Sequence, residues 1–330
     1  MKALILSGHG QIEIVDKPVP KISKNQVLVK VKAAGLNKRD QFIREGKYPG
    51  INLNTTLGSD ASGIVESVAD QSDQGWLGKE VIINPNIDWG SDSDVQAAQY
   101  SILGMPKDGT LAEYLVTETS RLSEKPDHLS FEEASALPLG GLTAFRACFH
   151  HGKIKADKNV LISGFGGGVA QFAFQFAQAA KANVYVTSSS EGKLQKAMDA
   201  GAEGAFNYTD SDWHKNAWKT KGGFDTVIDS SGGDQINTFI KLMRPAGRIV
   251  FFGATNGLPS SLDLYRMFWN QITLQGSTMG SDKEFEEMVR FVDENKIHPI
   301  LDSIRPFEEV VSAFDDMAEN KKTGKLVIKL

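Results

Sequence analysis

The stretch Val160-Leu161-Ile162-Ser163-Gly164-Phe165-Gly166-Gly167-Gly168-Val169-Ala170 decides the fold of this chain. An apolar strand runs into a cluster of glycines, and the cluster runs into a helix. Glycine permits a tight turn and lets the backbone approach a diphosphate, while the helix offers free N–H groups and the positive end of its dipole. The flanking strand and helix favour a dinucleotide-binding turn over an ordinary glycine turn. The residues expected to contact the cofactor there are Gly164, Gly166, Gly167, Gly168, Val169 and Ala170.

Helices and apolar strands alternate on both sides of this stretch. Strands are expected at residues 159–163, 183–186, 226–229 and 248–252, with helices between them. Fully apolar strands between helices indicate a parallel sheet that is covered on both faces. Ser130 followed by Glu133 is typical of a helix start just before this region. We therefore predict a doubly wound α/β domain over residues 124–265.

The first third of the chain has a different pattern. Short strands are expected at residues 27–32, 63–68 and 80–83, and no long amphipathic helix precedes about residue 130. A mainly β domain over residues 1–123 is the simplest interpretation. The tail, residues 266–330, contains two amphipathic helices, near 282–295 and 307–319, and a final strand at 325–329.

Composition limits the functions that the chain can have. It has 330 residues, 41% of them apolar and 23% charged, and a net charge of −5, which is typical of a globular enzyme and implies no broad attraction to nucleic acid or anionic lipid. No apolar run approaches the length of a membrane span. Cys148 is the only cysteine, which suits a cytoplasmic protein and excludes any structural zinc site that needs two cysteines from one chain.

The end of the second expected strand bears on the choice of cofactor. An NAD-specific site usually has an acidic residue there for the ribose hydroxyls. This chain has Ser188 and Ser189, with Lys193 shortly after, and these suit the 2′-phosphate of NADP(H) better. Glu191 is the competing observation, because it could reach a ribose and favour NAD. Lys193 could also be an ordinary solvated helix residue.

Several further segments resemble a known family. They include Gly58-Ser59-Asp60-Ala61-Ser62-Gly63, Ala134-Ser135-Ala136-Leu137-Pro138 and Gly324-Lys325-Leu326-Val327. Together with the glycine stretch, they are similar to the zinc-independent, quinone oxidoreductase-like branch of the medium-chain dehydrogenase/reductases. The resemblance implies a GroES-like catalytic domain (1–123), a Rossmann NADP-binding domain (124–265) and a C-terminal segment (266–330) that completes the Rossmann sheet edge and returns to the catalytic domain.

The resemblance also has consequences for assembly and for the cofactor. It implies a homodimer that pairs strand edges, with residues 248–252 and 271–275 as the nearest candidates. It implies that Tyr208 and Lys193 lie by the adenosine phosphate.

The chain departs from zinc alcohol dehydrogenases at the ligand positions. Asn37 stands where those enzymes have a catalytic cysteine, Ser59 where they have a histidine, and Leu139 near a further cysteine. Asparagine and serine are poor zinc ligands, and leucine is none. We therefore predict no metal-binding residues.

Without a metal, hydrogen-bond donors must polarise a substrate carbonyl, and simple alcohol oxidation is disfavoured. The chain is therefore interpreted as an NADPH-dependent reductase of a small quinone or α,β-unsaturated carbonyl. The candidate catalytic residues are Asn37, Tyr48 and Thr143. By resemblance, Asn37 and Tyr48 line the substrate pocket and Thr143 approaches the nicotinamide.

Each candidate has a plainer alternative. Asn37 could be satisfied by backbone in a turn, and Tyr48 could only pack beside Pro49. Gly253 ends a strand where a nicotinamide would lie, or is an ordinary turn glycine. Lys325 approaches a cofactor phosphate, or is a strand-edge lysine. The alternative functions are an aldehyde or enoyl-thioester reductase on the same scaffold and a low-turnover NADPH-binding sensor or structural protein.

Overall fold

The computed structural model describes residues 1–319 and 323–330. The chain divides into two compact units: unit 1 contains residues 1–140 and 281–330, and unit 2 contains residues 141–280. The units divide after residues 140 and 280, whereas the boundaries expected from the sequence lie after residues 123 and 265, about 15 residues earlier in each case. The difference arises because residues 124–140 and the start of the tail pack with elements on the other side of the expected boundaries.

Unit 2 is built on a six-stranded parallel sheet with the order β12-β11-β10-β13-β14-β15. From β10 the chain winds outward to β12 and then restarts beside β10 with β13, so the strand order reverses between β10 and β13. The strands are β10 (Asn159–Ile162), β11 (Asn183–Ser188), β12 (Gly204–Asn207), β13 (Phe224–Asp229), β14 (Met243–Phe251) and β15 (Thr273–Gly276).

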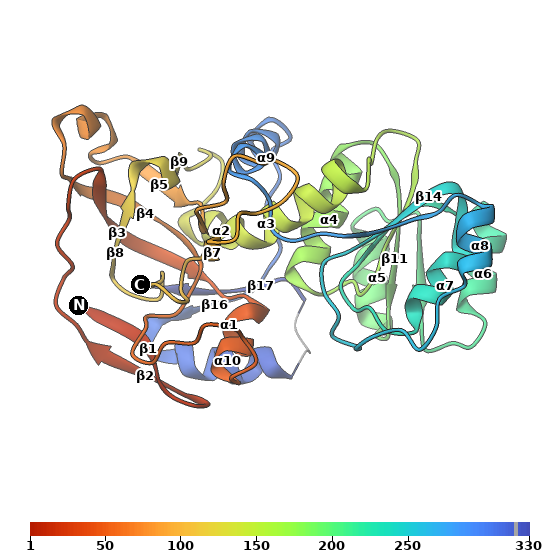
Figure 1. Ribbon diagram of the computed structural model, residues 1–330, viewed down its shortest axis with the longest axis horizontal. Coiled ribbons are helices and arrows are strands. Elements are labelled where there is room, and N and C mark those ends of the chain that lie inside the picture. The colour runs from red at the N-terminus through yellow and green to blue at the C-terminus, as the bar shows by residue number, and fades with distance from the viewer. Residues whose placement is uncertain (320–322) are drawn as a thin grey trace. The chain divides into compact units, whose positions relative to one another are not determined.

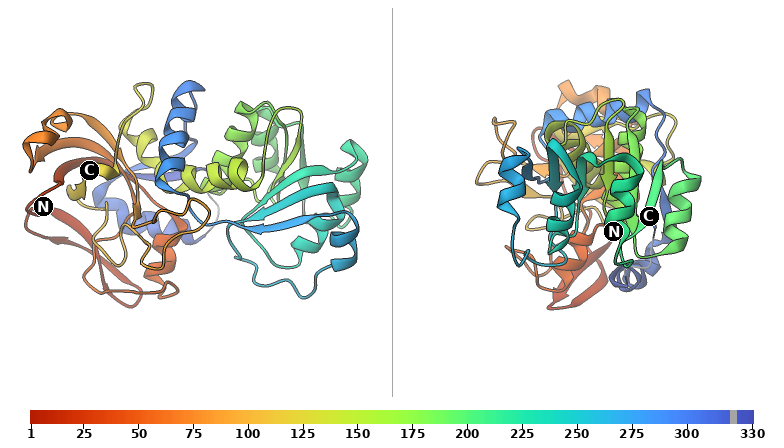
Figure 2. Two further views of the ribbon diagram at one scale, coloured as in Figure 1. Left: turned by 45° about the horizontal axis from the view of Figure 1, so that its top comes forward. Right: turned by 90° about the vertical axis from the view of Figure 1, so that its right-hand side faces the viewer.

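Helices cover both faces of this sheet (Figures 1 and 2). Every residue of β10 is buried, as expected for a central strand between two helical layers. The doubly wound α/β architecture predicted from the sequence is therefore confirmed. The helices are α4 (Gly168–Ala179), α5 (Glu191–Asp199), α6 (Trp213–Lys221), α7 (Gln235–Leu242) and α8 (Leu264–Trp269).

One expectation about the sheet edge is wrong. Residues 248–252 cannot offer a free strand edge, because β14 is hydrogen-bonded to β13 on one side and to β15 on the other. β15 is the outer strand at that end of the sheet, and it contains most of the other candidate segment, residues 271–275.

Unit 1 is mainly β, as predicted. Its main sheet has the order β16-β17-β3-β4-β5-β9, with β8 also paired to β3. The strands of unit 1 are β1 (Lys2–Gly8), β2 (Gln11–Asp16), β3 (Gln26–Gly35), β4 (Asp60–Val68), β5 (Glu80–Ile83), β6 (Asn86–Ile87), β7 (Ser101–Ile102), β8 (Tyr114–Glu118), β9 (Leu122–Glu124), β16 (Leu301–Pro306) and β17 (Lys325–Lys329).

Within residues 1–140, 281–319 and 323–330, five α-helices begin in unit 1. Ser130 and Glu133 form the expected capping box, in which the Glu133 N–H donates to Ser130 Oγ at 3.1 Å. None of the described helices combines the length and the apolarity that crossing a membrane requires. The helices are α1 (Lys38–Arg44), α2 (Phe131–Ala136), α3 (Pro138–Phe145, which runs on into unit 2), α9 (Asp282–Glu294) and α10 (Val310–Ala318).

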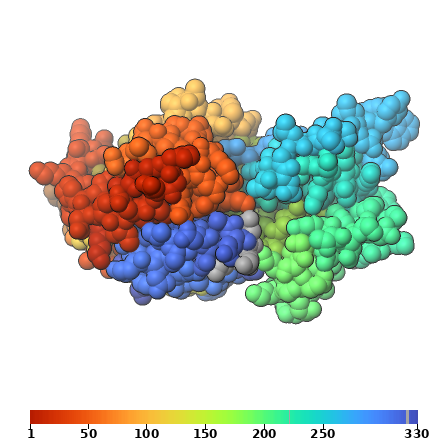
Figure 3. Space-filling view, turned by 90° about the horizontal axis from the view of Figure 1, so that it is seen from below, coloured from red at the N-terminus to blue at the C-terminus, as the bar shows by residue number. Residues whose placement is uncertain are grey.

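The last strand of the chain is an interior strand of unit 1. β17 lies between β16 and β3, with Val327 opposite Gly35, and the Leu36 N–H donates to the Leu326 carbonyl at 2.9 Å. The C-terminal segment accordingly lies against the N-terminal residues of this unit (Figure 3). This pairing brings Lys325 to the segment that begins α1.

Candidate active site

Asn37 occupies the position immediately before α1. Its backbone N–H donates to Asp40 Oδ2 at 2.8 Å, which fixes the start of the helix. The side chain is only 7% exposed, so its amide groups need partners inside the unit.

Asn37, Asp60 and Lys325 form a closed, buried triangle of hydrogen bonds. Lys325 Nζ donates to Asn37 Oδ1 at 2.6 Å and to Asp60 Oδ2 at 3.0 Å, and Asn37 Nδ2 donates to Asp60 Oδ2 at 2.8 Å. Asp60 is fully buried, and Lys325 is 4% exposed. The alternative in which backbone groups of a turn satisfy the Asn37 side chain is therefore wrong. Its Oδ1 and its Nδ2 each form a hydrogen bond with a charged side chain.

A backbone donor completes the surroundings of Asp60. Its Oδ1 accepts a hydrogen bond from the Leu139 N–H, in the first turn of α3, at 2.8 Å. The carboxylate thus accepts hydrogen bonds from three donors, so both of its oxygens are satisfied inside the unit.

Arg39 fills the space beside this triangle and is 8% exposed. Its guanidinium lies over the Tyr48 ring, 4.6 Å from the centroid, so Tyr48 packs against a cation as well as against the apolar core of unit 1. The guanidinium donates to Ser59 Oγ at 2.8 Å and to the carbonyl oxygens of Leu103 at 3.1 Å, Ile102 at 3.1 Å and Met105 at 2.9 Å. These bonds hold the start of α1 against residues 102–105.

Asp40 is a fully buried carboxyl next to Arg39. Its Oδ2 accepts from the Asn37 N–H, whereas Oδ1 has no hydrogen-bond partner among the described residues. Burial raises the pKa of Asp40 to about 6, against the lowering effects of the Arg39 guanidinium and the Asn37 N–H. Asp40 holds the start of α1 in place through this hydrogen bond.

Two tyrosines differ in how their hydroxyls are engaged. The Tyr100 hydroxyl donates to Asn86 Oδ1 at 2.7 Å, and burial raises the pKa of Tyr100. The Tyr100 ring lies edge-on to the Trp89 ring, with 5.2 Å between the ring centroids. The Tyr48 hydroxyl bonds to no residue in the described part of the chain, so it can serve a ligand.

The glycine turn of unit 2 has the backbone that the sequence predicted. Gly164 (φ 71°) and Gly166 (φ 143°) adopt conformations that favour glycine, and Gly167 precedes the first residue of α4. Since Gly167 has no side chain, none caps the N–H groups of the first turn of α4 from that position. Such groups are ready donors to a phosphate.

Lys193 and Glu191, which compete in the choice of cofactor, are placed differently. The Lys193 side chain lies across the turn, since a Cβ added to Gly166 would come within 2.9 Å of its Nζ. Glu191 Oε1 accepts from Asn207 Nδ2 at 2.5 Å. The Lys193 ammonium therefore lies by the glycine turn that is expected to bind phosphate, whereas the Glu191 carboxylate is engaged by the Asn207 amide.

The other predicted cofactor residues occur at the carboxyl ends of strands. Ser188 ends β11 and is buried, Ser189 is exposed, and the Tyr208 N–H donates to the Ser188 carbonyl at 3.2 Å. Gly253 follows β14, and an added Cβ would lie 2.6 Å from the Ser230 carbonyl oxygen, so only glycine fits. Thr143 Oγ1 donates to Met279 Sδ at 3.6 Å.

Contacts with cofactor or substrate stay predictions for the candidate residues. For Val169 and Ala170, at the start of α4, the structure adds that Ala170 is buried. Lys325 is not a strand-edge lysine, because β17 is paired on both sides, and its ammonium is engaged by Asn37 and Asp60.

Sequence reasoning missed Arg39 and the role of Asp60. Asp60 is a charged residue at the start of a segment of small and apolar residues, and such a residue needs a paired partner. That signal could have identified Asp60, whereas Arg39 lies among other polar residues and gives no such signal.

The residues at the zinc-ligand positions do not fit a tetrahedral zinc site. Asn37 bonds Lys325 and Asp60, Ser59 Oγ bonds Arg39 and the Leu103 carbonyl, and Leu139 offers only a backbone N–H toward Asp60. In the described part of the chain, no three or more His, Cys, Asp or Glu side chains are grouped so that they could hold a metal ion. Zinc sites require such donors.

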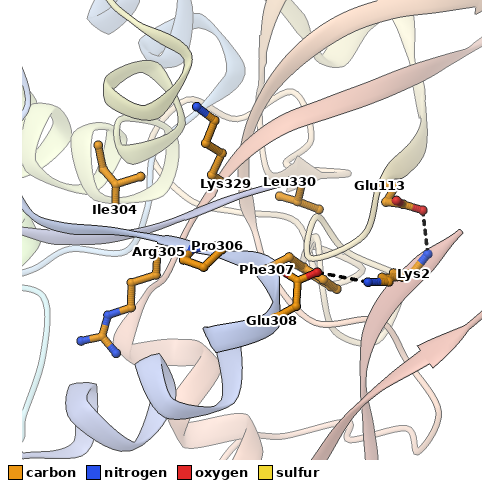
Figure 4. A pocket seen from close by; sticks show the side chains of 9 residues that line it. All are labelled: Lys2, Glu113, Ile304, Arg305, Pro306, Phe307, Glu308, Lys329 and Leu330. Atoms are coloured by element: carbon orange, nitrogen blue, oxygen red, sulfur yellow. Dashed lines mark hydrogen bonds and ion pairs between the residues drawn. The ribbon is translucent and has the colours of Figure 1, made fainter.

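A separate surface pocket of unit 1, of about 340 Å³, shares no residue with this network (Figure 4). Its charged side chains have partners nearby: Lys2 pairs with Glu308 at 3.1 Å, and Lys329 pairs with Glu132 at 3.4 Å. The pocket is lined by Lys2, Glu113, Ile304, Arg305, Pro306, Phe307, Glu308, Lys329 and Leu330.

Comparison with known families matches both parts of the chain. The family described as "Alcohol dehydrogenase GroES-like domain" matches residues 23–127, and the family described as "Zinc-binding dehydrogenase" matches residues 168–294.

Individual relatives match over nearly the whole chain. A zinc-type alcohol dehydrogenase-like protein, YogA of Leptosphaeria maculans, is 35% identical over 97% of this chain and 93% of its own length. A 2-methylene-furan-3-one reductase of Solanum lycopersicum is 30% identical over 99% of this chain and 79% of its own. A crystal structure of an NAD-dependent alcohol dehydrogenase, 34% identical, matches with a TM-score of 0.94 and covers 100% of both chains.

The fold, the glycine turn and these matches agree. The chain belongs to the medium-chain dehydrogenase/reductase superfamily of oxidoreductases, and it combines a GroES-like alcohol dehydrogenase domain with a parallel-sheet domain of the kind that binds a nicotinamide cofactor.

Proposed function

We propose that this protein transfers hydride from NADPH to a small quinone or α,β-unsaturated carbonyl without zinc. The observation that carries the proposal is the buried Asn37–Asp60–Lys325 triangle, in which an ammonium and a carboxylate bond the amide of Asn37, the residue that by resemblance replaces a zinc-ligating cysteine. Activated acceptors suit such a site because their conjugated systems spread the negative charge that hydride addition creates. The cofactor supplies the hydride when it is bound.

The chain's own residues have distinct roles in this reaction. The Asn37 amide and the Tyr48 hydroxyl are the hydrogen-bond donors proposed for the substrate oxygen, and Thr143 is proposed to lie by the nicotinamide. Tyr48 has the free hydroxyl that the role needs, and Arg39 holds its ring. The tomato relative's name describes a carbonyl conjugated to a methylene group, which supports this class of acceptor.

The preference for NADPH rests on unit 2. Lys193 lies across the glycine turn, and Glu191 is engaged by Asn207. Lys193 also follows the end of β11, where the adenosine ribose is expected, so its ammonium can pair with a 2′-phosphate. One solved relative is named NAD-dependent, so the relatives do not support NADPH over NADH. The proposed preference for NADPH therefore rests on this chain's own residues.

We also propose that two copies associate through β15 and α8. β15 ends the sheet and has no charged residue to protect its edge. Close to it in sequence, α8 exposes large apolar side chains. A second copy could pair with the free edge and cover that patch at once. The exposed side chains are Leu264, Tyr265, Phe268 and Trp269, at 64%, 81%, 62% and 79%.

The proposed reaction is tested by supplying NADPH with quinones, enones, aldehydes and enoyl thioesters while metal content is measured. We expect turnover on quinones or enones, zinc well below stoichiometric, and rates unchanged by chelation. Turnover confined to aldehydes or enoyl thioesters would support the alternative reductase, and binding without turnover would support a sensor. Stoichiometric zinc, with activity lost on chelation, contradicts the mechanism.

Lys193→Met should weaken NADPH binding about tenfold and leave NADH binding unchanged, because it removes a charge-assisted hydrogen bond to the 2′-phosphate. Fluorescence titration with both cofactors measures this. The control is Lys196→Met, an exposed lysine on the same helix. Equal losses for NADPH and NADH would rule out the assigned role.

The double variant Tyr265→Glu/Trp269→Glu should convert a dimer to a monomer, since it places charges in the apolar patch. Sedimentation velocity on wild type and variant measures this. A wild type that sediments as a monomer at micromolar concentration removes the proposal.

Asp40→Asn should change how stability depends on pH. Between pH 3.8 and about 6 the folded chain keeps the Asp40 proton while the unfolded chain has lost it. Wild-type stability should therefore fall relative to the variant as pH rises through this window, by up to about 3 kcal/mol, and then stay level. Urea unfolding at several pH values measures the difference. A difference that does not vary with pH contradicts the assignment.

A further inference from the structure

Lys325 is the least expected residue of the interior of unit 1. Lysine is seldom buried unless it is paired, and Lys325 lies on an interior strand with 4% exposure. A buried ion pair adds little net stability over an apolar pair of the same size. Stability alone therefore does not account for a lysine at this position.

The ammonium determines which way the Asn37 amide faces. An ammonium can only donate hydrogen bonds, and a carboxylate can only accept them. Asn37 Oδ1 must therefore face Lys325 Nζ, and Nδ2 must face Asp60, as the 2.6 and 2.8 Å contacts show. An amide nitrogen has two N–H bonds, so one remains available as a donor to a ligand.

The ammonium also strengthens that remaining donor. A charged donor at 2.6 Å from Oδ1 draws electron density away from the amide, which makes its N–H groups better donors. Asp60 holds the ammonium in place, and the Leu139 N–H holds Asp60. The charge is fixed before any substrate arrives, which is the condition for electrostatic stabilisation of a developing oxyanion.

We propose that Lys325 is a positioning residue for the reduction and that its buried ammonium supplies the fixed positive charge that a metal ion supplies in zinc-dependent members. It acts through Asn37: it orients the amide, polarises it, and favours negative charge on the substrate oxygen as hydride arrives. The same charge repels a divalent cation. This inference rests on the proposed function.

The test separates the charge from its structural effect. Lys325→Met leaves Asp60 buried without its ammonium and should destabilise the chain. Asp60→Asn combined with Lys325→Met removes both charges and should restore the unfolding midpoint. We expect kcat with the best quinone or enone to stay about 100-fold below wild type in the double variant, while NADPH affinity changes less than twofold.

Lys329→Met is the matched control. Lys329 lies on the same strand, its side chain is 66% exposed, and it pairs with Glu132 at the surface. This variant should keep wild-type kcat.

The outcomes are distinguishable. Recovery of kcat to within threefold of wild type in the double variant would show that the pair is only structural, and would overturn the inference while leaving the proposed function intact. A loss confined to KM or to NADPH binding would also overturn it. Wild type that reduces no quinone or enone would remove the proposed function itself, and this inference with it.

Discussion

The pairing of β17 with β3 is the constraint on which unit 1 depends. It inserts the last strand of the chain between β16 and a strand formed by residues 26–35. The first side chain of this strand is buried in the unit, and that side chain is a lysine. The hydrogen bonds that Lys325 donates to Asn37 and Asp60 follow from this one placement.

The patterned parts of the fold could be predicted from the sequence. The strands near 159, 226 and 325 are short apolar runs, and the glycine turn lies between a strand and a helix, so periodicity was enough to identify them. β12 and α6 were missed because Gly204 begins the strand and the helix has little apolar character, so neither has a strong pattern. The strand order that makes β14 interior is a long-range property, which local pattern does not determine.

The candidate site shows the same limit. Asn37 and Tyr48 could be proposed from resemblance, and the glycines from the turn chemistry. The partners of Asn37 could not, because Asp60 and Lys325 lie 23 and 288 positions away in sequence and meet only when the sheet forms. Arg39 was missed because its partners are mainly backbone carbonyls, which no residue type reveals.

Unit 2 is one continuous segment, whereas unit 1 is split around it. During synthesis every strand of the parallel sheet therefore leaves the ribosome before β16 and β17 exist. Nascent chains generally fold domain by domain as they emerge. The mainly β unit therefore keeps an unfilled place beside β3 until β17 has been synthesised, so the ammonium reaches Asn37 only after the whole parallel sheet has been made.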